Sequence, residues 1–289
     1  MRRLAIACAI VGAIGVIAAI LLLRPDAVAG PCVVEHRTTV AELHEASGLA
    51  ISRRSPGILW SHNDSGNETV LFALDANGAL RGRVRVPIRT RDWEDISAAR
   101  CPAGDCLYIA DIGDNRRART RIPIYRVPEP APADAETAAP EVFHATYPDG
   151  AHNAEALFVV GEHIFIVTRE RDGILYRSAL PAGGTFDMRL ERTGQLGLTS
   201  PVTDAETATD EGTVVVRTSK LVNIYRTADL VRGGSVSPVL SIAIEGLKEP
   251  QGEAVALGAH GLLFLASEGR PWNRAGRFIR LRCNDESVR

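Results

Sequence analysis

Four glutamates, each just ahead of a short apolar run, form the most chemically informative pattern in this chain. They are Glu94 in DWEDIS (92–97), Glu155 in NAEALF (153–158), Glu206 in DAETAT (204–209) and Glu253 in QGEAVA (251–256). If such positions converge on one axis, the carboxylates raise one another's pKa unless cations or arginines balance them. A hard cation with oxygen ligands, Ca²⁺ most readily, is the usual solution in an exported protein. The structural alternative is that each glutamate accepts hydrogen bonds from the backbone of the next repeat.

Further polar groups stand where the following strand of each repeat is expected to end. We place Asp111 and Asp114 in the candidate metal set together with the four glutamates. The candidate ligand-binding residues are His62, Asn63, Asp64, Asn115, Arg169, Arg217, Glu268 and Arg270. Mixed arginine and carboxylate groups suit an anionic ligand bridged by a metal. For SHNDSGN and ADIGDN, plain turn chemistry is the competing interpretation, because tight turns select Asn, Asp and Gly.

The spacing of the glutamates indicates the architecture that would bring them together. Successive glutamates are 61, 51 and 47 residues apart, and Gly48 in the weaker copy ASGLAI (46–51) lies 46 residues before Glu94. A period of about 45–50 residues is typical of propeller blades. DAET also occurs at 134–137, but the prolines around that copy predict a loop rather than a blade.

Each repeat carries the short β-branched and aromatic runs that strands require. The second strands are expected at 57–64, 106–114, 163–170, 213–219 and 262–268. The third are expected at 69–75, 122–128, 173–180, 221–227 and 277–283, and the fourth at 81–88, 141–147, 188–194 and 238–245. The fifth repeat has no fourth strand of its own, whereas 32–40 (CVVEHRTTV) precedes the first repeat. We therefore predict an all-β propeller of about five blades, with six as the alternative, closed by this N-terminal strand.

The cysteines agree with that closure. Outside the N-terminal apolar segment there are four, an even number that suits an oxidising compartment. Cys101 and Cys106 flank a hairpin turn in CPAGDC and form the local pair, which leaves Cys32 to pair with Cys283. The alternative for the local pair is half of a metal site, but no second Cys/His pair has suitable spacing.

The N-terminal segment predicts export. Residues 4–23 contain no charged side chain and follow Arg2 and Arg3, which suits one hydrophobic helix with a cytoplasmic N-terminus. AVAG (27–30) resembles a signal-peptidase site, so residues 1–29 are either a signal peptide or, as we favour, a membrane anchor. Residues 30–289 are then the extracytoplasmic propeller domain. Removing the three arginines and one aspartate of residues 1–29 from the 33 basic and 35 acidic residues leaves about −4, which argues against nucleic-acid binding.

The stretch SGLA…LWSHNDSGN…LFALDANG…DWEDI…LYIADIGDN resembles a bacterial propeller group that includes SdiA-regulated proteins and esterase-like phytase domains. The resemblance covers most of residues 46–283 and implies an exported propeller that binds Ca²⁺ through Glu94, Glu155, Glu206 and Glu253. Two features differ from that group. Its propellers usually have six blades, and the glycine that usually follows the first glutamate is Asp95 here.

Three functions remain open on the sequence alone. The first is a non-enzymatic, monomeric module that binds a ligand or a cell-envelope protein, with a structural Ca²⁺. The second is a Ca²⁺-dependent phosphoesterase in which Arg169, Arg217 or Arg270 holds the phosphate. The third is a glycosidase with a central carboxylate pair, for which Trp60, Trp93 and Trp272 are the available aromatic platforms.

Overall fold

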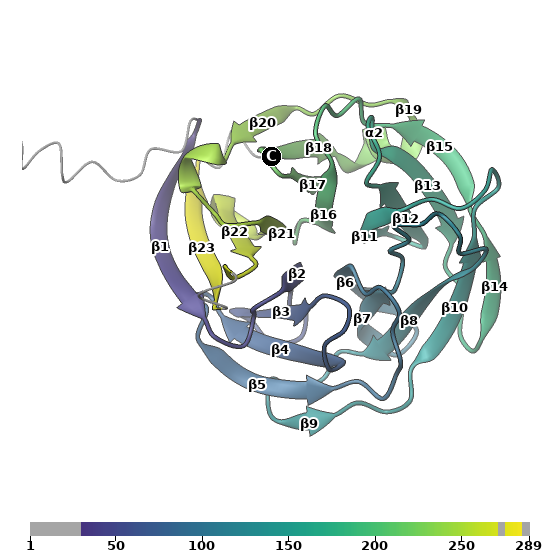
Figure 1. Ribbon diagram of the computed structural model, residues 1–289, viewed down its shortest axis with the longest axis horizontal. Helices are drawn as coiled ribbons and strands as arrows, with labels where there is room; N and C mark the ends of the chain where they lie inside the picture. Colours follow the sequence, from purple (N-terminus) through teal and green to yellow (C-terminus); the bar gives the residue numbers. More distant parts are fainter. Residues whose placement is uncertain (1–29, 271–274, 285–289) are drawn as a thin grey trace, which may run out of the picture.

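Five sheets surround a common axis in the computed structural model, which describes residues 30–270 and 275–284 (Figure 1). We number the blades in chain order and give their strands from the axis outward. Blade 1 comprises β2 (Ala46–Ile51), β3 (Ile58–Asn63), β4 (Val70–Asp75) and β5 (Leu80–Arg85). Blade 2 comprises β6 (Asp95–Cys101), β7 (Gly104–Ala110), β8 (Ile122–Pro128) and β10 (Glu141–Thr146). Blade 3 comprises β11 (Ala154–Val160), β12 (His163–Thr168), β13 (Ile174–Ala179) and β15 (Glu191–Gln195).

Blades 4 and 5 complete the ring. Blade 4 comprises β16 (Val202–Thr207), β17 (Thr213–Thr218), β18 (Leu221–Arg226) and β20 (Leu240–Ala243). Blade 5 comprises β21 (Gly252–Leu257), β22 (Leu262–Ser267), β23 (Gly276–Cys283) and β1 (Cys32–Val40). Helical structure in the described residues is limited to α2 (Thr227–Arg232) and the single turns η1 (Glu245–Leu247) and η2 (Ala259–Gly261). The expected five-bladed propeller is confirmed.

Blade 5 takes its outermost strand from the other end of the described chain. β1 pairs antiparallel with β23, and Cys32 stands directly opposite Cys283. The two cysteines form a disulfide across 251 residues of sequence, and Cys101 forms the second disulfide with Cys106. Both expected disulfides are confirmed, and such bonds persist in oxidising compartments.

Three blades receive an additional short outer strand from the blade that follows. β9 (Ala135–Glu136) pairs in parallel with β5, β14 (Phe186–Arg189) with β10, and β19 (Gly234–Ser235) with β15. The run expected as one strand at 188–194 is therefore divided. Its first part extends blade 2 through β14, and its second part is β15 of blade 3.

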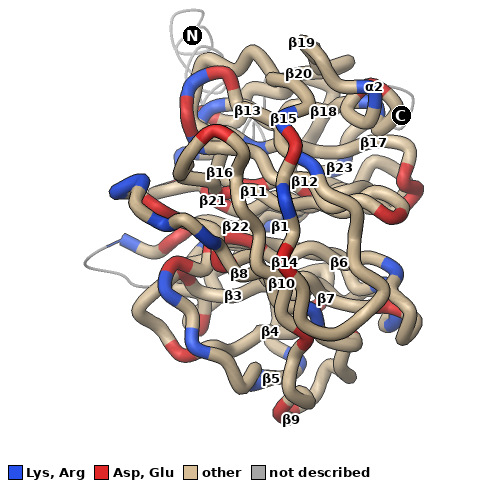
Figure 2. The backbone as a smooth tube through the Cα atoms, turned by 90° about the vertical axis from the view of Figure 1, so that its right-hand side faces the viewer, with Lys and Arg blue, Asp and Glu red and all other residues tan. Residues whose placement is uncertain are grey.

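Apolar side chains fill the space between each pair of neighbouring blades, so both faces of every sheet are covered. Trp60 and Trp93, for example, are buried between blades 1 and 2, and Phe158 stacks on Phe165 between blades 3 and 4. Burial of these two tryptophans removes them as sugar platforms, and Trp272 lies outside the described residues. Charged residues of both signs alternate along the outer backbone (Figure 2).

The predicted helix, signal peptide or anchor at residues 1–29 lies outside the described residues. Within residues 30–270 and 275–284, no helix has both the length and the apolar character that a membrane crossing needs.

We predict that the closing disulfide matters more to stability than the local one. In the chain-entropy picture a cross-link stabilises more when it closes a longer loop, up to about 5 kcal/mol for very long loops. Cys32→Ser with Cys283→Ser should therefore lower the free energy of unfolding by about 2–5 kcal/mol in guanidinium titrations. The matched control, Cys101→Ser with Cys106→Ser, should cost about 2 kcal/mol or less because it opens a short loop. Equal losses would contradict this account.

Candidate functional site

The inner strands start with a bulge that turns one side chain out of the ladder. The pairing register shifts between Ala154 and Ala156 in β11, and between Gly252 and Ala254 in β21, which leaves Glu155 and Glu253 as the extra residues. Glu94 stands at the same place directly before β6, where its N–H donates to the carbonyl of Ala110 at 3.0 Å. Bulges re-aim side chains in this way and recur beside functional sites.

Glu206 does not belong to this set, which corrects the sequence alignment of the repeats. In β16 the register shifts between Val202 and Asp204, so Thr203 takes the position that Glu155 and Glu253 hold. The hydroxyl of Thr203 donates to the carbonyl of Glu253, just as Ser47 in blade 1 donates to the carbonyl of Glu94. Glu206 lies three residues further along, where Ser97 and the backbone N–H of Ala98 donate to its carboxylate at 2.6 and 3.1 Å. The sequence DAET therefore matches the repeated motif, but its glutamate lies three residues beyond the bulge position of β16.

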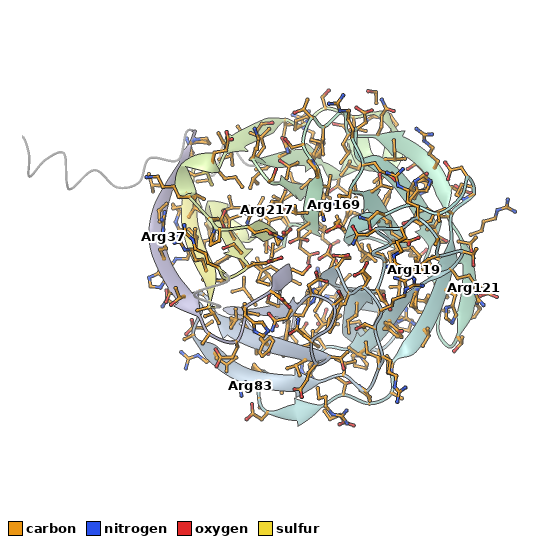
Figure 3. All side chains as sticks on the ribbon, in the orientation of Figure 1. Arg37, Arg83, Arg119, Arg121, Arg169 and Arg217 are labelled. Atoms are coloured by element: carbon orange, nitrogen blue, oxygen red, sulfur yellow. A yellow bond between two sulfur atoms is a disulfide. The ribbon has the colours of Figure 1, made fainter. Side chains whose placement is uncertain are left out.

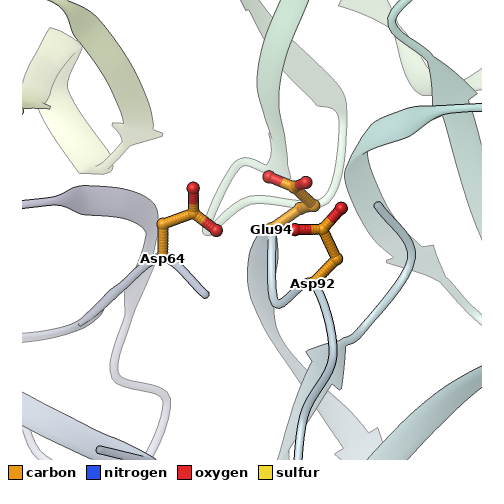
Figure 4. A group of neighbouring side chains, drawn as sticks. All are labelled: Asp64, Asp92 and Glu94. Carbon is orange, nitrogen blue, oxygen red and sulfur yellow. The ribbon is translucent and has the colours of Figure 1, made fainter. Parts of the chain in front are cut away.

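Three carboxyl groups meet where blades 1 and 2 approach the axis (Figure 4). Asp64 follows β3, and Asp92 and Glu94 precede β6. One oxygen from each lies within 4.8 Å of the other two. We call Asp64, Asp92 and Glu94 the acidic cluster. Asp92 is absent from the sequence-based metal set, although its place two residues before Glu94 in DWEDIS was a usable signal.

The loop after β7 gives the acidic cluster its room. A side chain at Gly113 would collide with the carboxylates of Glu94 and Asp92, so only glycine leaves space for both. The N–H of Gly113 also donates to the carbonyl of Asp92 at 3.1 Å. Asp111, in the same loop, accepts hydrogen bonds from the backbone N–H groups of Arg91 and Asp92 at 3.0 and 2.8 Å. Asp111 therefore positions the cluster and is not one of its members, contrary to the sequence-based metal set.

Blade 3 brings a fourth carboxyl group and a cation beside the cluster. Arg169 donates to Glu155 at 2.6 Å, and its side chain is 41% exposed. Asn153 donates to Glu155 at 3.3 Å and also accepts from the backbone N–H of Asp114 at 2.6 Å. Asp114 itself accepts from the N–H of Arg119 at 2.6 Å, and Asn115 accepts from Asn153. Asp114 and Asn115 therefore support Glu155 and do not enter the cluster.

The cluster is electrostatically strained when no cation balances it. Glu94 is only 4% exposed. Burial, followed by the charges of Glu155, Asp64 and Asp92, raises the pKa of Glu94 to about 11. Burial also raises the pKa of Asp64 to about 6 and that of Glu155 above its usual range, the latter despite the nearby Arg169. Without a cation, Glu94 therefore keeps its proton and shares it with Glu155.

Further acidic groups continue round the same end of the channel. Burial raises the pKa of Glu253 and of Glu268 to about 7, and each also senses the charge of Glu155. Gln251 donates to Glu268 at 2.7 Å. Arg270 follows shortly after and is exposed. Arg169 and Glu253 also line a pocket of about 440 Å³ between blades 4 and 5, which adjoins the cluster through Arg169 but is not lined by Asp64, Asp92 or Glu94.

A second, deeper group of carboxyls fastens blades together. Asp95 accepts from the backbone N–H of Leu157 in the next blade at 2.7 Å. Asp204 accepts from Val255 in the next blade at 2.5 Å. Burial raises the pKa of both aspartates, and the charge of Asp204 raises that of Asp95 further. Bonding to the next blade, expected of the repeated glutamates, is thus made by Asp95 and Asp204, whereas Glu206 of blade 4 accepts across the channel from Ser97 and Ala98 of blade 2.

Three sequence-based ligand candidates turn out to be structural. His62 is fully buried, stacks on Trp93 with ring centroids 4.1 Å apart, and accepts from the N–H of Gly48; burial lowers its pKa to about 3. Asn63 donates to the carbonyl of Glu42 at 2.8 Å. Arg217 lies near the axis with Arg169 in Figure 3, but it is 1% exposed.

The guanidinium of Arg217 is held inside the wall between blades 4 and 5. It donates to the carbonyl of Ala254 at 2.8 Å and to Glu249 at 2.5 Å. Arg217 is therefore a structural clamp between these blades.

No protein-family model and no curated protein sequence matches this chain. Among solved structures, it resembles the pyrroloquinoline-quinone-bound aldose sugar dehydrogenase of Streptomyces coelicolor with a TM-score of 0.49 at 14% identity, covering 89% of this chain and 99% of that one. It also resembles a gluconolactonase of Xanthomonas campestris with a TM-score of 0.48 at 10% identity, covering 86% and 89%. Both of those proteins are bacterial enzymes. At such identities the likeness assigns no activity to this chain.

We predict that the cation-free protein loses stability as the pH rises. The folded-state pKa values of Glu94, Asp64, Glu253 and Glu268 all lie above their unfolded values, so the folded protein binds more protons than the unfolded chain. The free energy of unfolding in EDTA should therefore fall between about pH 5 and pH 8. Urea titrations at several pH values measure it.

Glu94→Gln removes the group with the largest of these shifts and should flatten this pH dependence. The variant should be more stable than the wild type at pH 8 in EDTA, because an amide is neutral without taking up a proton on folding. A wild-type stability that rises from pH 5 to pH 8 would contradict the account.

Proposed function

We propose that the acidic cluster binds Ca²⁺ and that the propeller acts as an exported module binding an anionic ligand at that end of its channel. The observation that carries the proposal is the carboxyl group of Glu94. It is almost fully buried, and the hydrogen-bonding partner of its carboxyl among the described residues is another carboxyl, that of Glu155. Buried charges are normally paired or bound to metals.

The composition and spacing of the site suit calcium. Three carboxyl groups form the cluster and Glu155 adjoins it, and the guanidinium of Arg169 is paired with Glu155. Ca²⁺ takes oxygen ligands at about 2.3–2.6 Å, so oxygens on opposite sides of the ion lie roughly 5 Å apart. One carboxylate oxygen each of Asp64, Asp92 and Glu94 lies within 4.8 Å of the other two, which is compatible with that geometry. Mg²⁺ demands shorter, strictly octahedral contacts, which an uneven set of side chains meets less well.

The surroundings of the cluster support an anionic ligand. A bound Ca²⁺ would offset two of the four carboxylate charges of Asp64, Asp92, Glu94 and Glu155, and the guanidinium of Arg169 would offset a third. An anionic ligand would therefore be held by direct coordination to the ion and not by a net positive charge. Thr203, Ser219 and Gln251 line the adjoining pocket and offer hydrogen-bonding groups. The partner is then a small anion or an anionic group on a cell-envelope protein, met outside the cytoplasm by a monomer. A membrane tether through residues 1–29 and membership of the SdiA-regulated or phytase-like group remain parts of this proposal.

A phosphoesterase is the second candidate, and Arg169 favours it. A cation and an adjacent arginine are the two groups that stabilise charge in phosphoryl transfer. Residues of this chain would hold the cation through the acidic cluster and orient the phosphate through Arg169. The metal would supply Lewis-acid activation.

We predict a calcium-dependent rise in thermal stability. At a concentration one hundred times the dissociation constant, a bound ion stabilises the folded state by about 2.7 kcal/mol, a shift of several degrees in Tm. Glu94→Gln and Asp92→Asn should each abolish the shift. Glu206→Gln is the matched control because it changes an equally buried glutamate outside the cluster, and it should retain the shift. Loss of the response in Glu206→Gln alone would contradict the proposed ligand set.

We predict further that Gly113→Ala weakens calcium binding at least tenfold, because the new methyl group displaces Glu94 and Asp92. Isothermal titration calorimetry measures the change. Gly212→Ala is the control for glycine replacement, since Gly212 has no positive φ and a side chain there meets only ordinary contacts at 3.5 Å or more. Equal binding by wild type and Gly113→Ala would show that the ion sits elsewhere.

A screen of phosphomonoesters separates the two candidate functions. Turnover that EDTA removes and that falls strongly in Arg169→Gln would establish the phosphoesterase. A flat screen, with calcium binding intact, would leave the binding module.

A further inference from the structure

The opposite end of the channel carries a second cavity that the calcium proposal does not use. It has a volume of about 550 Å³ and is lined by the far ends of β6, β11 and β16, including Ala98, Val159 and Thr207. The acidic cluster stands at the start of β6, so the two sites are separated by the length of that strand, roughly 20 Å. A cavity of this volume is in the range that small ligands occupy.

We call this second cavity the lower pocket. Hydrogen bonds and ion pairs hold part of its wall in place. Arg126, which is 2% exposed, is held by Glu141 at 2.7 Å and by the carbonyls of Pro181 and Ala182 at 3.2 Å each. Its guanidinium lies over the ring of Tyr108, with 6.0 Å between its carbon and the ring centroid. Arg53 is held by Glu211 at 2.8 Å. Arg126 and Arg53 are therefore held in place before a ligand binds, so a ligand need not order this part of the wall.

Two charges on the lining are left without a partner. Arg53 and Arg126 have their carboxylates, and Glu211 has Arg53. The side chains of Arg100 and Glu162 line the same pocket, are exposed to solvent, and make no ion pair or hydrogen bond with any described residue. They are therefore further apart than the 4.0 Å of an ion pair, and apolar surface from Val159 and Leu180 belongs to the same lining.

We propose that the lower pocket binds a short apolar peptide with both termini free, its carboxylate at Arg100 and its ammonium at Glu162. A dipeptide spans about 7 Å when extended, which suits two charges too far apart to pair directly. Its apolar side chains would lie against Val159, Leu180 and Tyr108. The local disulfide fixes the turn that presents Arg100, since Cys101 is the next residue and lines the same pocket.

The test is calorimetric titration of the full protein with leucyl-leucine, its N-acetyl derivative and its C-terminal amide. Wild type should bind leucyl-leucine, and each capped derivative should bind about two- to fivefold more weakly, as the loss of one exposed ion pair implies. Arg100→Gln should remove the discrimination against the amide only. Glu162→Gln should remove the discrimination against the acetyl form only. Arg189→Gln, an exposed arginine of the outer strand β14, is the control and should bind as wild type does.

Ala182→Trp should block the pocket without disturbing the core, because Ala182 is exposed at its rim. EDTA and Glu94→Gln should leave peptide binding unchanged, so the outcome is independent of the calcium site. No binding at millimolar peptide, or equal binding by wild type and both charge variants, would overturn the proposal. Equal binding of the N-acetyl and free peptides by wild type would also overturn it, because the pocket would then recognise an anion and not a zwitterion.

Discussion

The energetic cost of burying carboxyl groups on the propeller axis constrains the rest of this structure. A carboxylate removed from water needs a proton, an N–H donor or a cation. Asp95 and Asp204 receive backbone N–H groups from neighbouring blades, and Glu206 receives Ser97 and the backbone of Ala98. Within the part of the chain that the structure describes, no N–H group is bonded to the carboxyl of Glu94, which shares its proton with Glu155. Buried carboxyl groups therefore bridge blades at one depth of the channel. At another depth, the carboxyl of Glu94 lacks a group that would stabilise its charge.

Local features of the backbone hold Glu94 and the neighbouring carboxyl groups in place. Bulges at the starts of β11 and β21 turn Glu155 and Glu253 out of the ladder, and Gly113 leaves room for Glu94 and Asp92. Asp111 ties the loop that precedes β6 through two backbone N–H groups. The pairing of β1 with β23 and the Cys32–Cys283 disulfide tie the start of the described chain to blade 5, which closes the ring that contains these blades. The stability of the whole ring compensates for the electrostatic repulsion among these carboxyl groups.

Most of the architecture could be predicted from the sequence, because strand composition, repeat spacing and cysteine pairing are local or countable properties. The site was less predictable, because a bulge moves one residue out of the pairing register and no residue type in the sequence marks its position. Glu206 matched the motif and lies elsewhere, while Thr203 holds the equivalent position with no resemblance to glutamate. Asp64 and Asp92 come from different blades, so only the fold brings them together. The unpaired charges of Arg100 and Glu162 likewise depend on which neighbours already have partners.

The most direct test of the central claim is an anomalous difference map from crystals grown with Mn²⁺, a calcium substitute with a strong anomalous signal, near pH 7.5. The account predicts one peak among Asp64, Asp92 and Glu94, with carboxylate oxygens about 2.1–2.6 Å from the ion and the proton-sharing contact between Glu94 and Glu155 broken. A map without a peak there, with Glu94 still bound to Glu155, would contradict it and would leave the cluster as a proton-holding element of the fold.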